Sequence, residues 1–387
     1  MQIGRPAAPI EQSTDTAVRF MPVDALRGIA ALGVLMFHLL RNSPQTEVLD
    51  RIMPPWMKSI SDLGRTGVAI FFVISGFVIA YTTDRSGDRL RDGFRFSVRR
   101  QVRLDPPYYA VLLVVIAISL VERQIPALVH REFTLTDALL NTLYLQGITD
   151  RPALLSVAWT LCIEVQFYLV VVTFTMMRGS RVFRSAPPRV RFAVVPAAAV
   201  LVGLVSAALP FFDAAGGPWF ISYWILFLIG MIAHWYHVAS IPRWSAWAAM
   251  ASIGGWLVAL EIHQSGQAFT ETWAGWLTGL GLMALASSQR LTAKPPKVLL
   301  FFGAISYSLY LIHMPVIDTV MALGFKLTGD SGSGAAAAYL LGATGSVFGA
   351  WVLHRTIEMR SMSWSTSLKQ VSASELFLGA SSRLRRR

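Results

Sequence analysis

Cysteine and charged residues are both scarce in this chain of 387 residues. The single cysteine, Cys162, excludes an intrachain disulfide and a cysteine-rich zinc cluster, and we expect no bound metal. Charged residues make up only 14% of the chain, whereas soluble proteins contain about 25%. This deficit excludes an ordinary soluble multidomain protein.

Long apolar segments occupy most of the chain instead. Hydrophobic residues make up 54% of the sequence, and the mean hydropathy is +0.52. A helix needs about 20 apolar residues to cross the hydrocarbon core of a bilayer. The sequence therefore predicts an all-α polytopic membrane protein in a lipid bilayer. Ten predicted transmembrane helices cover about 24–41, 64–82, 106–121, 154–177, 192–211, 218–238, 244–262, 272–288, 298–323 and 335–357.

Basic residues select the orientation of these helices. With the N-terminus in the cytoplasm, 26 of the 34 Lys and Arg residues fall in cytoplasmic segments and 8 in outer loops. We therefore expect both termini in the cytoplasm. The net charge of +12 is then mainly a topology signal, and we expect no nucleic-acid partner. The predicted organisation is a cytoplasmic segment (1–22), a membrane domain (23–360) and a basic, flexible cytoplasmic tail (361–387).

Two ionisable side chains lie in the first predicted helix. Arg27 and His38 are eleven residues apart, so both project from one face, separated by about 16 Å along the helix axis. His38 is either a satisfied core histidine or a general base that takes a proton from a hydroxyl. Asp24 is either the N-cap of this helix or a partner of Arg27.

Glu164 is the one charged residue in the fourth predicted helix. A carboxylate at membrane depth is costly unless it is paired, so we expect Glu164 to pair with Arg27 or His38. Trp159 and Tyr168 add polar edges to the same helix. Trp159 is either part of a site or an aromatic anchor at the outer interface.

Two further helices carry candidate residues. Ser306, Tyr310 and His313 have the spacing i, i+4, i+7 and form one polar stripe on the ninth predicted helix. The stripe serves either hydrogen bonding between helices or the lining of a substrate passage. In the second predicted helix, Gly67 and Gly76 would allow another backbone to approach closely.

A basic segment, FRFSVRRQVRLDPPYY, precedes the third predicted helix. Its Arg100 and Arg103 lie one turn apart. Paired guanidinium groups at a cytoplasmic membrane face suit phosphate groups, although basic residues there can also serve topology alone.

Five stretches, taken in order, resemble the acyltransferase-3 family of integral membrane O-acyltransferases. The resemblance runs from about Val23 to about Glu358, and Ala69, Thr160 and Val165 depart from the family pattern. The stretches are DALRGIAALGVLMFH, GRTGVAIFFVISGFVI, RRQVRLDPPYY, WTLCIEVQFYL and SYSLYLIHMPV.

The resemblance implies a bacterial inner-membrane enzyme that moves an acyl group, usually acetyl, from cytoplasmic acetyl-CoA or another acyl-CoA to a hydroxyl of a glycan or exported polysaccharide. His38 would be the base, Glu164 the carboxylate that orients it, and Arg27 the group that polarises the thioester. Arg100 and Arg103 would bind the CoA. The residues expected to contact the acceptor are Asp24, Trp159, Tyr168, Ser306, Tyr310 and His313.

Two other functions fit the same residues. One is acylation of a small molecule or a lipid-linked sugar. The other is a proton-coupled transporter without acyl chemistry, since intramembrane His, Glu and Arg suit proton coupling. Transporters often have internal repeats and paired broken helices, whereas this sequence shows no repeat. Binding of acyl-CoA would distinguish the two classes.

Overall fold

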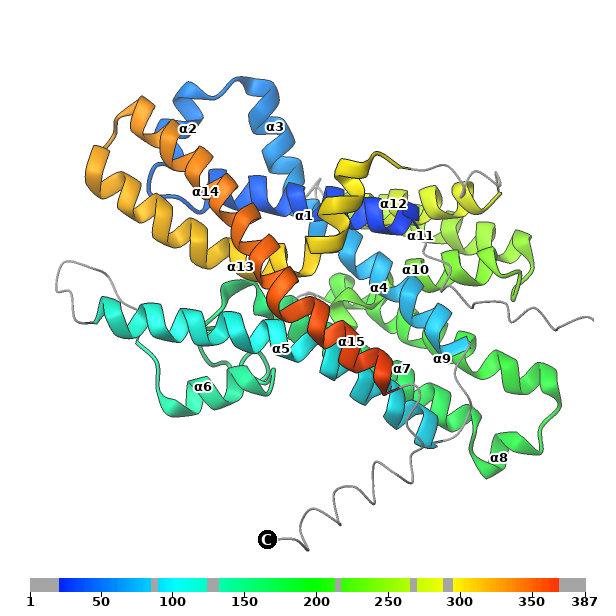
Figure 1. Ribbon diagram of the computed structural model, residues 1–387. Helices are drawn as coiled ribbons and strands as arrows, with labels where there is room; N and C mark the ends of the chain where they lie inside the picture. The colour runs from blue at the N-terminus through cyan, green and yellow to red at the C-terminus, as the bar shows by residue number, and fades with distance from the viewer. Residues whose placement is uncertain are drawn as a thin grey trace, which may run out of the picture.

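The computed structural model of the chain describes residues 21–84, 90–123, 132–212, 217–264, 270–287 and 295–368 (Figure 1). Within these ranges the regular secondary structure is entirely helical, so the predicted all-α class is confirmed. Residues 1–20 of the predicted N-terminal segment and 369–387 of the predicted tail lie outside the described part.

A helix lies at each of the ten predicted positions. Eight described segments are long and apolar enough to cross a membrane, and they include all of these helices except α9 and α12. The ten helices are α1 (Met21–Arg41), α4 (Gly67–Asp84), α5 (Leu90–Glu122), α7 (Trp159–Arg178), α9 (Pro188–Ala208), α10 (Trp224–His237), α11 (Arg243–His263), α12 (Thr270–Ser287), α13 (Lys297–Thr328) and α14 (Gly332–Leu353).

Shorter helices connect or extend these long ones. They are α2 (Thr46–Ile52), α3 (Pro55–Leu63), α6 (Leu135–Thr142), α8 (Arg181–Arg184) and α15 (Met359–Ser367). Helix α15 follows α14 through one π-helical turn and packs along α5 (Figure 1). The first seven residues of the segment predicted as a flexible tail are therefore helical.

Helix α5 begins well before its predicted start and continues through two prolines, Pro106 and Pro107. A proline has no N–H group, so Pro107 leaves the Arg103 carbonyl without its usual helical donor. The Ser361 hydroxyl of α15 donates to this carbonyl oxygen at 2.9 Å. The Tyr307 hydroxyl of α13 donates to the Leu104 oxygen at 2.7 Å. Neighbouring helices therefore hold the arginine-rich half of α5 against the membrane domain.

Helices α1 and α13 run parallel and in close contact. A Cβ atom on Gly28 would lie 2.9 Å from the Gly303 nitrogen, and His38 lies beside His313. Both pairs are 275 positions apart, which fixes the register of the two helices. The Gly28–Gly303 contact lets the backbones approach, and the two histidines therefore meet.

Glycines also set the crossing of α4 and α10, as expected for Gly76. A Cβ atom at Gly76 would lie 2.0 Å from the Phe227 oxygen, and one at Gly230 would lie 1.9 Å from the Val73 oxygen. These contacts are to backbone atoms, which a side-chain rotation cannot relieve. The crossing places Phe72 and Ser75 of α4 beside the cavities described below.

We expect Gly230→Ala to destabilise the protein, because the added methyl group must push α4 and α10 apart. Overpacking of this kind costs about 1–3 kcal/mol. Gly281→Ala is the matched control, since a Cβ at Gly281 meets no described atom within 4 Å. Thermal unfolding in detergent should show a lower midpoint for Gly230→Ala only. Equal midpoints for the two variants would contradict this packing.

Candidate active site

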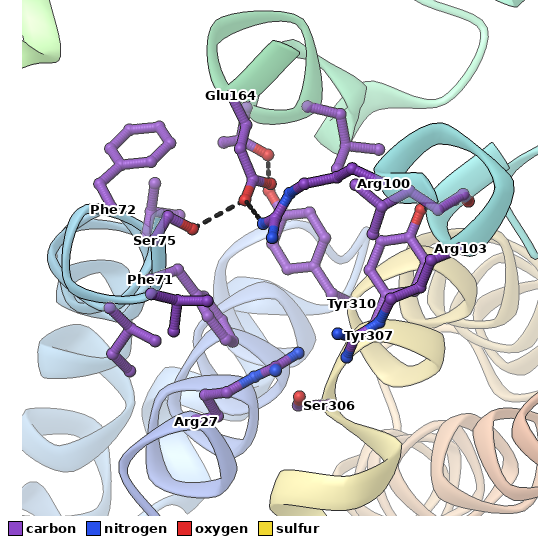
Figure 2. Close-up of a pocket in the computed structure, with 16 residues that line it drawn as sticks. Arg27, Phe71, Phe72, Ser75, Arg100, Arg103, Glu164, Ser306, Tyr307 and Tyr310 are labelled. Carbon is purple, nitrogen blue, oxygen red and sulfur yellow. Dashed lines mark hydrogen bonds and ion pairs between the residues drawn. The ribbon is translucent and has the colours of Figure 1, made fainter. Parts of the chain in front are cut away.

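Five helices, α1, α4, α5, α7 and α13, enclose a cavity of about 100 Å³ (Figure 2). Its charged lining residues are Arg27, Arg100, Arg103 and Glu164, and we call it the arginine cavity. Three of these side chains are cationic and one is anionic. The described lining therefore carries an excess of positive charge in a largely apolar setting, which favours an anionic or strongly polarised ligand.

Glu164 is the centre of the hydrogen-bond network in this cavity (Figure 2). Its Oε1 accepts from Ser75 Oγ at 2.7 Å and from Arg100 Nη2 at 3.0 Å. Arg100 also donates to the Tyr168 hydroxyl, and its guanidinium carbon lies 3.9 Å from the centre of the Tyr168 ring. These contacts hold the Arg100 guanidinium in one position, with the Glu164 side chain 18% exposed.

The expected pairing of Glu164 with Arg27 or His38 is therefore wrong. The ion-pair partner is Arg100. The sequence predicts that Arg100 precedes the third transmembrane helix, whereas α5 starts at Leu90 and carries Arg100 to the depth of Glu164. A continuous helix through a double proline was the unexpected feature.

Arg27 and Arg103 point toward one another across the lower part of the cavity, near Ser306 (Figure 2). Two like charges that face each other in an apolar setting repel, and an anion between them would relieve the repulsion. Glu358, which is 3% exposed, lies within electrostatic range of both arginines. It accepts from Ser308 Oγ at 2.6 Å and from His354 Nδ1 at 2.9 Å.

His38 lines a second and larger cavity of about 650 Å³, which we call the histidine cavity. Its lining combines polar groups with aromatic rings, including Trp159 and Tyr223. At its edge Arg65 pairs with Glu271 at 3.2 Å. A cavity of this volume falls in the range of small-ligand sites, about 300–1,000 Å³.

The two cavities adjoin. Val68, Phe72 and Tyr310 line both of them. The Tyr310 and Thr160 hydroxyls lie 2.7 Å apart, and Tyr310 donates to the Val157 oxygen at 3.1 Å. These bonds anchor the Tyr310 ring, which separates Glu164 on one side from His38 on the other.

A third cavity of about 220 Å³ adjoins the arginine cavity at the opposite end, and we call it the α15 cavity. Arg100 and Arg103 line both, and the α15 cavity adds Arg99, Ser365 and Thr366. The Ser365 hydroxyl donates to the Arg99 backbone oxygen at 2.8 Å, which holds α15 against this wall. The three cavities thus follow one another from the arginine-rich end of α5 to His38.

The structure distributes the other predicted site residues unevenly. Trp159 lines the histidine cavity, Ser306 lines the arginine cavity, and Tyr310 lines both. Tyr168 is buried against Arg100, and His313 is buried behind His38. Asp24 lies in the first turn of α1, inside the helix that begins at Met21, so it is not the N-cap.

Four residues outside the predicted site also contribute. Ser75 and Tyr307 line the arginine cavity, Arg99 lines the α15 cavity, and Glu358 lies within electrostatic range of Arg103. Glu358 follows His354 by four residues near the end of an apolar segment, a pattern that could have marked it. In the part of the chain that the structure describes, no group of three His, Cys, Asp or Glu side chains could hold a metal ion.

Comparison with known protein families identifies the family of this chain. An acyltransferase domain family, Acyl_transf_3, matches residues 23–355, which is most of the chain. The chain belongs to the acyltransferase-3 family. The resemblance read from the five sequence stretches is thus confirmed.

Three relatives of this acyltransferase-3 chain show how far the similarity extends. Acyltransferase MdmB of Streptomyces mycarofaciens is 29% identical over 50% of this chain and 48% of its own length. Nodulation protein 10 of Rhizobium leguminosarum bv. viciae is 28% identical over 78% and 84%. YrhL of Bacillus subtilis, provisionally named a peptidoglycan O-acetyltransferase, is 29% identical over 52% and 30%. The chain thus spans about half of the first of these relatives. No solved structure was found to match it.

Proposed function

We propose that this chain is a membrane O-acyltransferase that takes an acyl group, most simply acetyl, from acyl-CoA and transfers it to a hydroxyl of a glycan. The observation that supports this most strongly is the series of three adjoining cavities. It joins a group of arginines to a histidine through the interior of the helix bundle. A CoA thioester has anionic phosphates at one end and its reactive carbonyl at the other, and so fits such a path.

The donor would bind at the arginine-rich end, which would face the cytoplasm. The excess of basic residues in the predicted cytoplasmic segments supports this orientation. Arg99, Arg100 and Arg103 present guanidinium groups to the α15 cavity, and guanidinium groups bind phosphate through paired hydrogen bonds. Glu164 would act on the donor indirectly, because it holds Arg100 in place.

The pantetheine arm would then extend through the arginine cavity toward Tyr310. Arg27 of α1 lines this cavity near Ser306 of the neighbouring helix α13. Arg27 lies about 16 Å along α1 from His38, so its guanidinium would bind polar groups of the arm rather than the thioester carbonyl that reacts beside His38.

His38 would act as the general base at the histidine cavity. The acceptor O–H bond breaks and its proton moves to the imidazole, while the oxygen forms a bond to the thioester carbon. The carbon–sulfur bond then breaks, and the proton passes from the imidazolium to the departing CoA thiolate. The products are the ester and free CoA, and no other reactant is needed.

The acceptor would occupy the histidine cavity. Aromatic rings at Trp159 and Tyr223, together with the Arg65–Glu271 pair, provide stacking surfaces and hydrogen-bonding groups suited to a sugar. A small hydroxylated molecule or a lipid-linked sugar would use the same cavity, so acceptors of each class belong in the assay.

Arg103→Ala tests the donor site. We expect the variant to raise the KM for acetyl-CoA by about 10- to 100-fold, because a hydrogen bond to a charged group contributes about 1.5–3 kcal/mol. The KM for the acceptor should not change. Arg360→Ala is the control, since Arg360 is an exposed arginine on α15. The measurement is the initial rate of ester formation by the purified chain in lipid.

Two results would count against the proposal. If Arg103→Ala and Arg360→Ala depend on acetyl-CoA in the same way as the unmodified chain, Arg103 serves topology alone. If the unmodified chain binds no acetyl-CoA in an equilibrium binding assay, the transporter alternative gains, because a transporter has no need for an acyl donor.

A further inference from the structure

His313 is buried behind His38. The hydrogen bonds of the two rings determine which nitrogen of each ring carries the hydrogen. Only 1% of the surface of His313 is exposed, and this residue is not among the residues that line the histidine cavity. Its Nδ1 lies 3.0 Å from the Leu309 oxygen. A carbonyl oxygen can only accept, so Nδ1 carries the hydrogen and donates it. In the neutral ring, His313 Nε2 is then an acceptor.

The same reasoning extends to His38. Its Nδ1 lies 3.0 Å from the Val34 oxygen and 3.2 Å from His313 Nε2. Both neighbours are acceptors, so His38 Nδ1 carries the hydrogen and shares it between them. His38 Nε2 therefore carries the lone pair. Among the described residues no other hydrogen bond engages this ring, and the side chain lines the histidine cavity.

The register of α1 and α13 produces this arrangement. Each histidine donates to the carbonyl four residues earlier in its own helix, Val34 for His38 and Leu309 for His313. Because the helices run parallel with a constant offset of 275 residues, the two rings meet with centroids 5.0 Å apart. Ten residues before the histidines, Gly28 contacts Gly303, and this contact keeps the helices close enough for the rings to touch.

We propose that His313 is a positioning residue that, together with the Val34 carbonyl, holds His38 in the tautomer whose Nε2 lone pair serves the histidine cavity. His313 thus has the orienting role that the family resemblance implied for Glu164. When His38 accepts a proton at Nε2, the ring becomes cationic, and its Nδ1–H bond to His313 becomes charge-assisted. A neutral imidazole thus stabilises the imidazolium without adding a negative charge to an apolar region. The effect on catalysis rests on the proposed acyl transfer, whereas the tautomer does not.

Nitrogen NMR of the full chain labelled with [15N]histidine tests the tautomer directly. The chain has seven histidines, and the His38 signals are identified by their loss in His38→Asn. We expect His38 to show a protonated Nδ1 and an unprotonated Nε2. His313→Leu should show a larger share of the other tautomer, because only the Val34 oxygen then accepts from Nδ1. A protonated Nε2 in the unmodified chain, or an unchanged spectrum in His313→Leu, would overturn the assignment.

Kinetics of two substitutions test the consequence. We expect His313→Leu to lower kcat by about 10- to 100-fold with both KM values nearly unchanged, as for other residues that orient a functional imidazole. His313→Gln should recover most of kcat, because its amide oxygen can accept from His38 Nδ1. Equal losses in the two variants, or a rise confined to the acceptor KM, would overturn the positioning role.

The outcome of the NMR measurement can be distinguished from failure of the proposed function. If the NMR result holds and the purified chain transfers no acyl group, the proposed function is wrong and the tautomer assignment stands. If His313→Leu does not fold, His313→Gln and the spectrum of the unmodified chain still decide, since a protonated Nε2 in either would overturn the assignment.

Discussion

Replacement of His38 by alanine should abolish acyl transfer while leaving insertion and folding intact. General-base catalysis contributes about 10²- to 10⁴-fold, and alanine offers no group to take the acceptor proton. Because His38 is half-buried at a cavity wall, its loss leaves the helix contacts of α1 largely in place. The measurement is single-turnover ester formation with saturating acetyl-CoA, beside a thermal melt of the same preparation.

His263→Ala is the matched control for this prediction. His263 is an exposed histidine at the end of α11 and is not among the residues that line the three cavities. It should retain the full rate. An active His38→Ala variant would refute the role of His38 as the base, and inactivity accompanied by a lower melting temperature would assign His38 to structure instead.

Removal of the Glu164 carboxylate should have the second-largest effect. In Glu164→Ala, Arg100 keeps its charge but loses its ion-pair partner in a setting where its side chain is only 17% exposed. Breaking a buried ion pair in this way costs about 3–5 kcal/mol, and we expect somewhat less here because some solvent reaches the pair. The variant should melt at a lower temperature and bind acetyl-CoA much more weakly.

Glu164→Gln and a double-mutant cycle with Arg100→Met separate the two roles considered for this residue. If Glu164 only positions Arg100, glutamine keeps the bonds from Ser75 and Arg100 and changes mainly the KM for acetyl-CoA. The cycle should also show strong coupling between the two positions. A large fall in kcat with unchanged acetyl-CoA binding would instead tie Glu164 to His38, against the contacts described above.

The sequence predicted the helical class and the positions of the long helices well, because apolar length is a local property. It was less informative about α5. A double proline normally ends a helix, yet here Ser361 and Tyr307 bond to carbonyls beside it, and these partners lie more than 200 positions away. Pairings that depend on such distant contacts cannot be derived from spacing along one segment.

The same limit applies to the site. Arg27 and His38 were singled out correctly as ionisable groups at two depths of α1, since their spacing is a property of one helix. Their partners come from other helices, and the register of α1 against α13 decides that His38 meets His313. The sequence shows the polar stripe on α13, but it does not show that His313, the last residue of the stripe, faces His38.

The central claim is that the acyl end of a CoA thioester reaches position 38 from the arginine-rich end of the bundle. Alkylation by bromoacetyl-CoA tests it in a His38→Cys, Cys162→Ala chain, with Ser333→Cys, Cys162→Ala as the exposed control. The account predicts rapid alkylation of Cys at position 38 that acetyl-CoA blocks and Arg103→Ala slows. Alkylation at position 38 no faster than with bromoacetamide, and unprotected by acetyl-CoA, would contradict it.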